Sequence, residues 1–122
     1  MKSYRDLDIY QESYQLALDV HKLSLKLPNY EMYETGSQVK RSSKSVTANI
    51  VERYGRKIYK AEFIRFLIFS HSSCEETIIH LNFIRDLHNN LIEEADVFIE
   101  RYTELSKKIY RFIEYVEKEW KG

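Results

Sequence analysis

The sequence predicts an all-α fold, an antiparallel up-down-up-down four-helix bundle built as a single domain over residues 1–122. Apolar residues recur every three or four positions through four long segments, which is the spacing of one helix face. The chain has one Pro and three Gly, so it has few of the residues that end helices or form tight turns between strands. With 43% hydrophobic and 31% charged residues, it can bury one core of the usual domain size.

The first helix is expected over residues 8–27. Asp8 and Gln11 have the spacing of a capping box at its start. Pro28 ends it, because proline cannot continue the backbone hydrogen bonds and disfavours a helical residue before it. Its apolar face consists of Ile9, Leu16, Ala17, Val20, Leu23 and Leu27.

The second helix is expected over residues 37–54, with Thr35 and Gln38 at capping-box spacing and Gly55 as its end. Its apolar stripe is Val39, Val46 and Ile50. At 100° per residue, a row of polar side chains lies beside that stripe. We call this the polar row: Gln38, Arg41, Ser45, Asn49 and Glu52.

The third helix is expected over residues 59–87 and the fourth over residues 91–120. The apolar band of the third helix is wide enough to contact the core on one side and another subunit on the other. Asn90 and Glu93 have capping-box spacing before the fourth helix. The apolar residues of the fourth helix alternate by four and three, which is typical of a bundle seam.

The polar row is interpreted as structural rather than catalytic. Polar groups at the edge of a core are costly unless they are paired. In an antiparallel pair of helices, equal rise places Arg41 near Glu75 or Glu76. We therefore predict a polar network that holds the helices in register, with Glu76 as its member on the third helix. Replacing Arg41 with Ala is expected to disrupt folding or assembly.

The chain resembles a family of four-helix bundle proteins first met as open reading frames in intervening sequences of bacterial large-subunit ribosomal RNA genes. The family pattern is aromatic-x-x-Leu, then Pro-x-x-Glu, then Gln-x-x-Arg-x-x-x-Ser-Ile-x-x-Asn-Ile-x-Glu, and farther on Gly-Ser-x-x-Glu. The matching residues are Tyr4, Leu7, Pro28, Glu31, Gln38, Arg41, Ser45, Val46, Asn49, Ile50, Glu52, Ser72, Ser73 and Glu76.

The match spans nearly the whole chain, with three departures. Thr35 stands where the family usually has Leu, and Arg53 and Ser72 stand where it has Gly. The family is similar to the accessory protein of diversity-generating retroelements, a pentameric bundle associated with reverse transcriptase and nucleic acid. The resemblance therefore implies a homopentamer with helices around a central channel, and a link to nucleic acid.

Charge is divided unevenly along a chain whose net charge is zero. Residues 38–65 hold eight Lys or Arg against two Glu, whereas residues 66–104 hold two Arg against eight Asp or Glu. The cations could bind a phosphate backbone, with tyrosines nearby to stack on bases. They could equally form a solvated face, or pair with the acidic part of the same or a neighbouring subunit. The nucleic-acid candidates are Lys40, Lys44, Arg53, Arg56, Lys57 and Lys60.

No catalytic or metal site is predicted, and no cofactor. None of the four His has a Glu three residues earlier, as a bundle di-iron site requires, and Glu76 with His80 supplies only two ligands. Cys74 lies in an apolar stripe without a cationic activator, which favours a buried structural thiol. This lone Cys, the absence of an apolar signal segment and the lack of a membrane-length apolar run favour the cytoplasm.

Two function classes remain. The first is a non-enzymatic oligomeric interaction or scaffold module, accessory to a nucleic-acid-processing partner. The second is a direct RNA- or DNA-binding protein that uses the basic residues of the second helix and the following turn. Salt-dependent binding to nucleic acid separates them, because phosphate contacts weaken steeply as salt rises.

Overall fold

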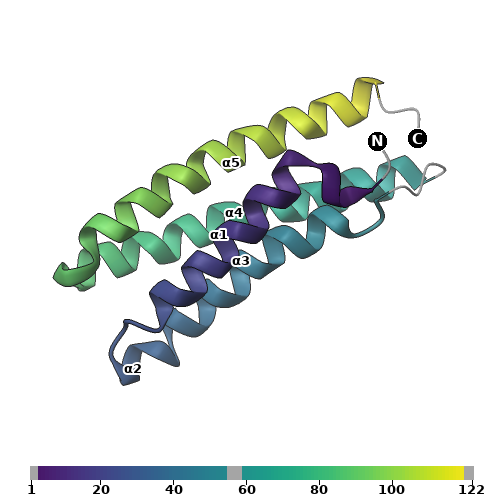
Figure 1. Cartoon of the computed structure of the whole chain (residues 1–122). Helices are drawn as coiled ribbons and strands as arrows, with labels where there is room; N and C mark the ends of the chain where they lie inside the picture. Colours follow the sequence, from purple (N-terminus) through teal and green to yellow (C-terminus); the bar gives the residue numbers. More distant parts are fainter. Residues whose placement is uncertain (1–2, 55–58, 120–122) are drawn as a thin grey trace.

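The structure is a computed structural model that describes residues 3–54 and 59–119. These residues form a four-helix bundle and contain no strand, which confirms the all-α prediction (Figure 1). Its long helices are α1 (Asp8–Ser24), α3 (Thr35–Val51), α4 (Lys60–Leu87) and α5 (Ile92–Glu119). Short helical segments precede three of them: η1 (Tyr4–Asp6), α2 (Asn29–Met32) and η3 (Asn89–Leu91).

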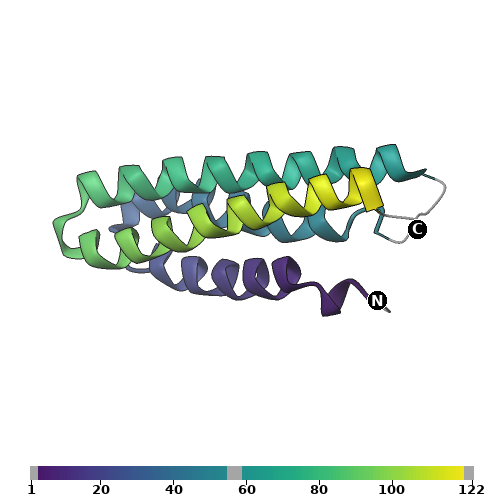
Figure 2. The same ribbon diagram turned by 90° about the horizontal axis from the view of Figure 1, so that it is seen from above.

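The helices α1 and α4 lie at opposite corners of the bundle. Each of them packs against both α3 and α5. Figure 2 shows α1 on one side, α4 on the other, and the two remaining helices between them. The outer face of α4 and the outer face of α1 therefore point in different directions, which matters for the surfaces described below.

The core is formed by side chains from all four long helices. Leu16, Val46, Leu67 and Leu105, one from each, have no exposed surface. Burying a side chain of this size contributes about 1.5–3 kcal/mol, so packing rather than intrinsic propensity holds these helices in place. None of the described helices combines the length and the apolar character needed to cross a membrane.

The observed helix bounds agree best with prediction in the second half of the chain. The third helix begins at Lys60 instead of 59, and the fourth extends from Ile92 to Glu119. The first helix ends earlier than predicted, at Ser24, and the second spans Thr35–Val51 rather than 37–54. The predicted stop at Gly55 and the predicted end at Trp120 lie outside the described residues.

The predicted capping boxes of the first two helices do not form. The N-caps are Leu7 and Glu34, and neither makes a side-chain cap. Gln11 Nε2 instead donates to a backbone carbonyl of η1 at 2.8 Å. Thr35 Oγ1 donates to Glu31 Oε1 at 2.7 Å. In both cases the residues before the long helix fold into a helical turn and supply a different hydrogen-bond partner.

The short helix α2 was not predicted, and it joins three parts of the bundle. Besides the Thr35 bond, the Glu31 carboxylate accepts a hydrogen bond from His88 Nε2 at 3.2 Å. Gly36 packs so closely beside α2 that a Cβ there would lie 3.3 Å from both Glu31 O and Leu27 Cδ1. The Pro-x-x-Glu segment therefore ties the start of α3 to the turn after α4.

Candidate functional site

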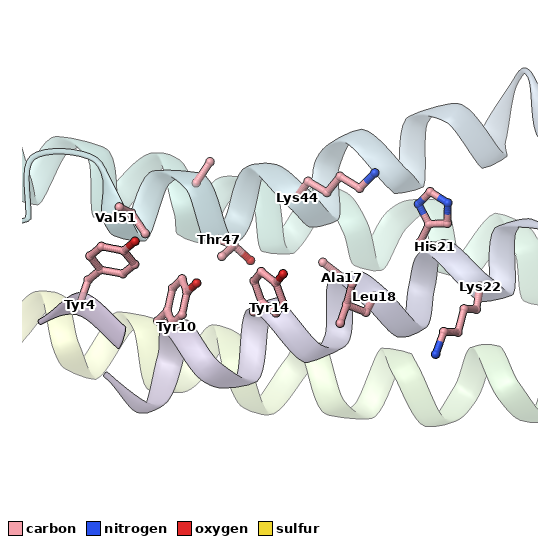
Figure 3. A pocket seen from close by; sticks show the side chains of 11 residues that line it. Tyr4, Tyr10, Tyr14, Ala17, Leu18, His21, Lys22, Lys44, Thr47 and Val51 are labelled. Carbon is pink, nitrogen blue, oxygen red and sulfur yellow. The ribbon is translucent and has the colours of Figure 1, made fainter. Parts of the chain in front are cut away.

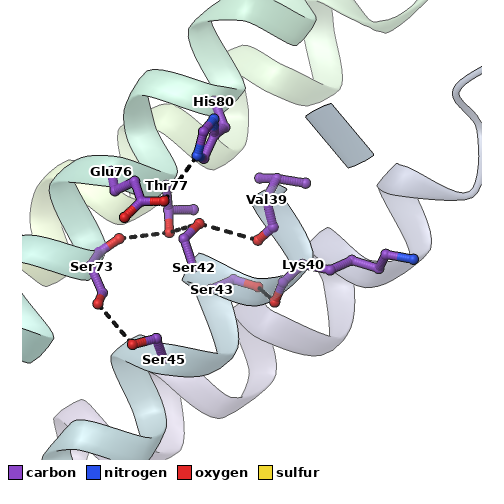
Figure 4. Close-up of polar contacts among 9 residues, drawn as sticks. All are labelled: Val39, Lys40, Ser42, Ser43, Ser45, Ser73, Glu76, Thr77 and His80. Atoms are coloured by element: carbon purple, nitrogen blue, oxygen red, sulfur yellow. Dashed lines mark hydrogen bonds and ion pairs between the residues drawn. The ribbon is translucent and has the colours of Figure 1, made fainter. Parts of the chain in front are cut away.

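The middle of the polar row lies in the interface between α3 and α4. Ser45 Oγ is 2.9 Å from Ser73 Oγ, so the two hydroxyls share a hydrogen bond across the interface (Figure 4). Asn49 Nδ2 donates to both the carbonyl and the hydroxyl of Ser45, at 2.9 Å each. These polar groups are paired within the protomer, as a structural role requires.

Three hydroxyl residues outside the polar row continue this interface. Thr77 Oγ1 lies 2.8 Å from both Ser42 Oγ and Ser73 O (Figure 4). Farther along, Ser70 Oγ donates to Val46 O at 2.7 Å. The sequence signal for them is a set of small residues at helical spacing on α3 and α4. We call the whole set the hydroxyl interface: Ser42, Ser45, Asn49, Ser70, Ser73 and Thr77.

The remaining residues of the predicted network are exposed: Gln38, Arg41, Glu52 and Glu76. Among the described residues, no ion pair or hydrogen bond joins Arg41 to Glu76, and Glu76 Oε2 instead lies 3.1 Å from His80 Nε2. At 100° per residue, Arg41 lies about 80° from Asn49 around α3, toward solvent. The structure thus brings Ser45 to α4, with Asn49 bonded to Ser45 on the same helix, but leaves Arg41 outside.

Two of the predicted cations lie beside α1. The pKa of His21 is lowered, first by partial burial of the imidazole and then by the positive charges of Lys44 and Lys40. Figure 3 shows the Lys44 amine and the His21 ring at the same end of the space between α1 and α3. Lys44 and Lys40 therefore make this end of the space positively charged, beside an imidazole whose protonated form they disfavour.

The other described cations of the predicted set occupy the far end of α3 and the start of α4. Arg53 Nε lies 3.5 Å from Glu62 Oε1, and Lys60 Nζ donates to Glu117 O at 2.8 Å. Their hydrogen-bonding capacity is therefore used partly within the protomer. Arg56 and Lys57 lie outside the described residues.

A groove with a volume of about 760 Å³ lies between α1 and α3 and was not predicted. Tyr10 and Tyr14 lie one turn apart on α1, with ring centroids 5.9 Å apart, and the Tyr4 centroid is 5.0 Å from that of Tyr10. All three rings point toward α3 (Figure 3). We call this the tyrosine groove; its apolar lining includes Tyr4, Tyr10, Tyr14, Leu18, Ala48 and Val51, and its basic end is His21 and Lys44.

The second exposed apolar surface lies on α4. Ile79 and Phe83 expose 53% and 54% of their surface, although both are large apolar residues. With 100° between successive residues, they share a sector of about 100° with three others. We call this set the α4 stripe: Ile68, Phe69, Ile79, Phe83 and Leu87. It faces away from the hydroxyl interface and the core.

The thiol of Cys74 lies in the core of the bundle. Cys74 is fully buried and donates to Tyr102 O at 3.3 Å. Burial, followed by the nearby carboxylates of Glu75 and Glu12, raises the pKa of Cys74 to about 12, so its thiolate is disfavoured at neutral pH. Within residues 3–54 and 59–119, no three His, Cys, Asp or Glu side chains cluster as a metal site would require.

Comparison with known proteins returned one family. The sequence model described as 23S rRNA-intervening sequence protein matches residues 5–111. No curated protein matches the chain. The matched region contains α1, α2, α3 and α4, the hydroxyl interface, the α4 stripe and most of α5. The chain therefore belongs to the 23S rRNA-intervening sequence protein family.

Proposed function

We propose that the protein is a non-enzymatic, oligomeric interaction or scaffold module of the cytoplasm, accessory to a partner that processes nucleic acid. In this proposal the bundle is antiparallel, up-down-up-down, and assembles as a homopentamer. The number five and the nucleic-acid partner come from the resemblance of the sequence to pentameric bundles of this type. The capacity to assemble is supported separately by the surface of the protomer.

The observation that carries the proposal is the α4 stripe. The five large apolar side chains of the stripe expose between 44% and 63% of their surface, Phe69 the least and Leu87 the most. Ile79, Phe83 and Leu87 follow one another at single-turn spacing, and a contiguous exposed apolar surface of this kind marks an interaction site on soluble proteins. Covering the stripe would remove that surface from water, and each side chain would contribute up to about 1–2 kcal/mol to association.

The antiparallel arrangement is supported by the order of contacts along the hydroxyl interface. Residues with rising numbers on α3 pair with residues of falling numbers on α4: Ser42 with Thr77, Ser45 with Ser73, and Val46 with Ser70. This is the order expected when two helices joined by a short connection run in opposite directions.

The test of the proposal is the mass of the protein in solution. Light scattering after size-exclusion chromatography and native mass spectrometry should both give a particle of five protomers. A stable monomer at micromolar concentrations would overturn the proposal. A closed oligomer with another number of protomers would correct the number five and leave the proposed scaffold role unchanged.

A second candidate function is direct binding of single-stranded RNA or DNA. Lys44 lies at the end of a groove that presents Tyr14, and bases stack on aromatic rings while cations bind phosphates. Binding to a labelled oligonucleotide should then weaken steeply with salt. The double substitution Lys40→Gln and Lys44→Gln should abolish it, whereas the matched change Lys107→Gln and Lys118→Gln on α5 should not. No binding at low salt would exclude this candidate.

A further inference from the structure

We infer that the α4 stripe of one protomer packs into the tyrosine groove of a second copy of the chain. This inference rests on the proposed oligomer and specifies which two surfaces form its contact. Both surfaces are apolar and exposed, and both belong to the described part of the chain. They are complementary in shape and in charge.

The shape of the groove suits a helix. It lies between two neighbouring helices, and Ala48 and Thr47 on α3 leave room between the larger Tyr14 and Leu18 of α1. A third helix can place a ridge of side chains into such a space, as in helix-in-groove recognition. The rise of 1.5 Å per residue gives about 16 Å from Tyr10 to His21 along the groove. By the same measure the whole stripe is about 28 Å long, from Ile68 to Leu87, so it is longer than the groove. Its part from Ile79 to Leu87 is about 12 Å long and fits within the groove.

Among the described helices, α4 presents the most continuous ridge for this groove. The α4 stripe occupies a sector of about 100° around its helix. On α5 the exposed apolar residues form two pairs about 140° apart, Ile92 with Tyr110 and Val97 with Tyr115, so they do not form one face. The exposed apolar residues of α1 already belong to the groove or lie beside it. The stripe is therefore the surface of a second copy that fits.

The charges of the two surfaces are opposite. The groove ends at Lys44 and His21, with Lys40 close enough to affect the pKa of that imidazole. The face of α4 that carries the stripe also carries Glu76, whose side chain is 57% exposed and lies 3.1 Å from His80 Nε2. Asp86 on the same face is paired with Arg85 at 2.9 Å, and Arg65 is paired with Glu62, so Glu76 is the main negative charge available to a neighbour. Complementary charge of this kind fixes register and disfavours contacts between two identical surfaces.

The positions of the two surfaces allow a closed ring. The groove lies between α1 and α3, and α1 stands at the corner of the bundle opposite α4 (Figure 2). One protomer can then offer its stripe to one neighbour and its groove to another. A contact between two different surfaces is heterologous, and repeated heterologous contacts close into a ring when the rotation permits.

The experiment uses two double variants of the full chain. The groove variant carries Leu18→Glu and Ala48→Glu, and the stripe variant carries Ile79→Glu and Phe83→Glu. All four positions are exposed, so the substitutions place charge in the contact without entering the core. A matched control carries Val97→Glu and Tyr110→Glu on α5, which are similarly exposed. Circular dichroism checks that each variant keeps its helix content.

Each double variant alone should be a monomer, and the α5 control should keep the wild-type mass. An equimolar mixture of the groove and stripe variants should form a particle of two protomers and no larger. In that mixture one intact stripe meets one intact groove, while the other two surfaces are blocked. Recovery of the pair also shows that both variants are folded.

The results that would overturn the inference are distinct from those that would overturn the proposed function. If the wild-type chain is a monomer, both the proposed oligomer and this contact are wrong. If the wild-type chain is an oligomer and either double variant keeps its mass, the proposed contact is wrong but the oligomer stands. The same conclusion follows if both variants are monomers and do not pair when mixed. Loss of oligonucleotide binding in the groove variant, with its oligomer intact, would assign the groove to nucleic acid instead.

Discussion

Arg53 has a backbone φ of 64°, in the left-handed region that favours glycine. It follows Glu52, the C-cap of α3, and thus occupies the position where many helices end on a glycine. The family pattern that this chain resembles has Gly here, and the backbone keeps the conformation that Gly would adopt. Ion pairs with Glu52 and Glu62 hold the side chain on the surface.

We expect Arg53→Gly to raise the free energy of unfolding by up to about 1 kcal/mol. A residue with a Cβ costs about 1–2 kcal/mol in this conformation, and the lost surface ion pairs and the greater freedom of Gly when unfolded offset part of that gain. Arg53→Ala is the control, because it removes the same charge and keeps the Cβ. Urea denaturation should show the Ala variant less stable than the Gly variant; equal stabilities would contradict this account.

At the scale of elements, Glu31 connects α2, α3 and the turn after α4. The side chains of Glu31 and His88 are only 14% and 8% exposed. The pKa of Glu31 is lowered chiefly by the hydrogen bond from Thr35, with a further contribution from His88 and an opposing contribution from burial. A carboxyl group whose pKa is lower in the folded chain stabilises the fold above its unfolded pKa.

Glu31→Gln should therefore lower the free energy of unfolding at neutral pH by about 1–2 kcal/mol, the range for hydrogen bonds to a charged group. As the pH falls through the folded pKa of Glu31, the wild-type carboxylate also becomes neutral, and the difference between the two proteins should shrink. Denaturation at a series of pH values measures this. Glu34→Gln is the matched control at an exposed position; a Glu31 effect that persists unchanged in acid would contradict the linkage.

The elements that could be predicted are those set by a long apolar period. The bounds of α4 were predicted within one residue, because Phe63, Leu67, Cys74 and Leu81 repeat one spacing and all are buried. The start of α1 was also predicted correctly, at Asp8, but its end and both ends of α3 were not. The predicted caps of α1 and α3 failed because their first turns are bonded to η1 and α2 instead. These short segments have no apolar period of their own, so their hydrogen bonds arise only when the chain is folded.

At the scale of the whole molecule, the hydroxyl interface was partly predicted and the tyrosine groove was missed. Ser45 and Asn49 stood out because they interrupt an amphipathic pattern on one helix. The groove combines Tyr4 of η1, Tyr14 of α1 and Val51 of α3, and no single helical period links them. The exposed apolar side of α4 was predicted, because the apolar band of that helix is wider than its contact with the core requires.

If the protein assembles as proposed, its melting temperature should depend on protein concentration. Association stabilises the folded chain by mass action, and a tenfold dilution should cost about 1 kcal/mol per protomer, or roughly 3–6 °C for a chain of this size. Scanning calorimetry over a range of concentrations measures the shift. The Ile79→Glu and Phe83→Glu variant is the control and should show no such dependence; a concentration-independent wild-type would contradict assembly coupled to stability.

The hydroxyl interface also affects how the bundle responds to temperature. Exposing apolar surface on unfolding raises the heat capacity, whereas exposing polar groups lowers it. The seam between α3 and α4 buries Ser42, Ser70 and Thr77 in place of larger hydrocarbon side chains. Opening that seam should therefore change the heat capacity less than opening an all-apolar contact of equal area. The contribution of this interface to the free energy of unfolding should therefore weaken less on cooling than that of an all-apolar contact.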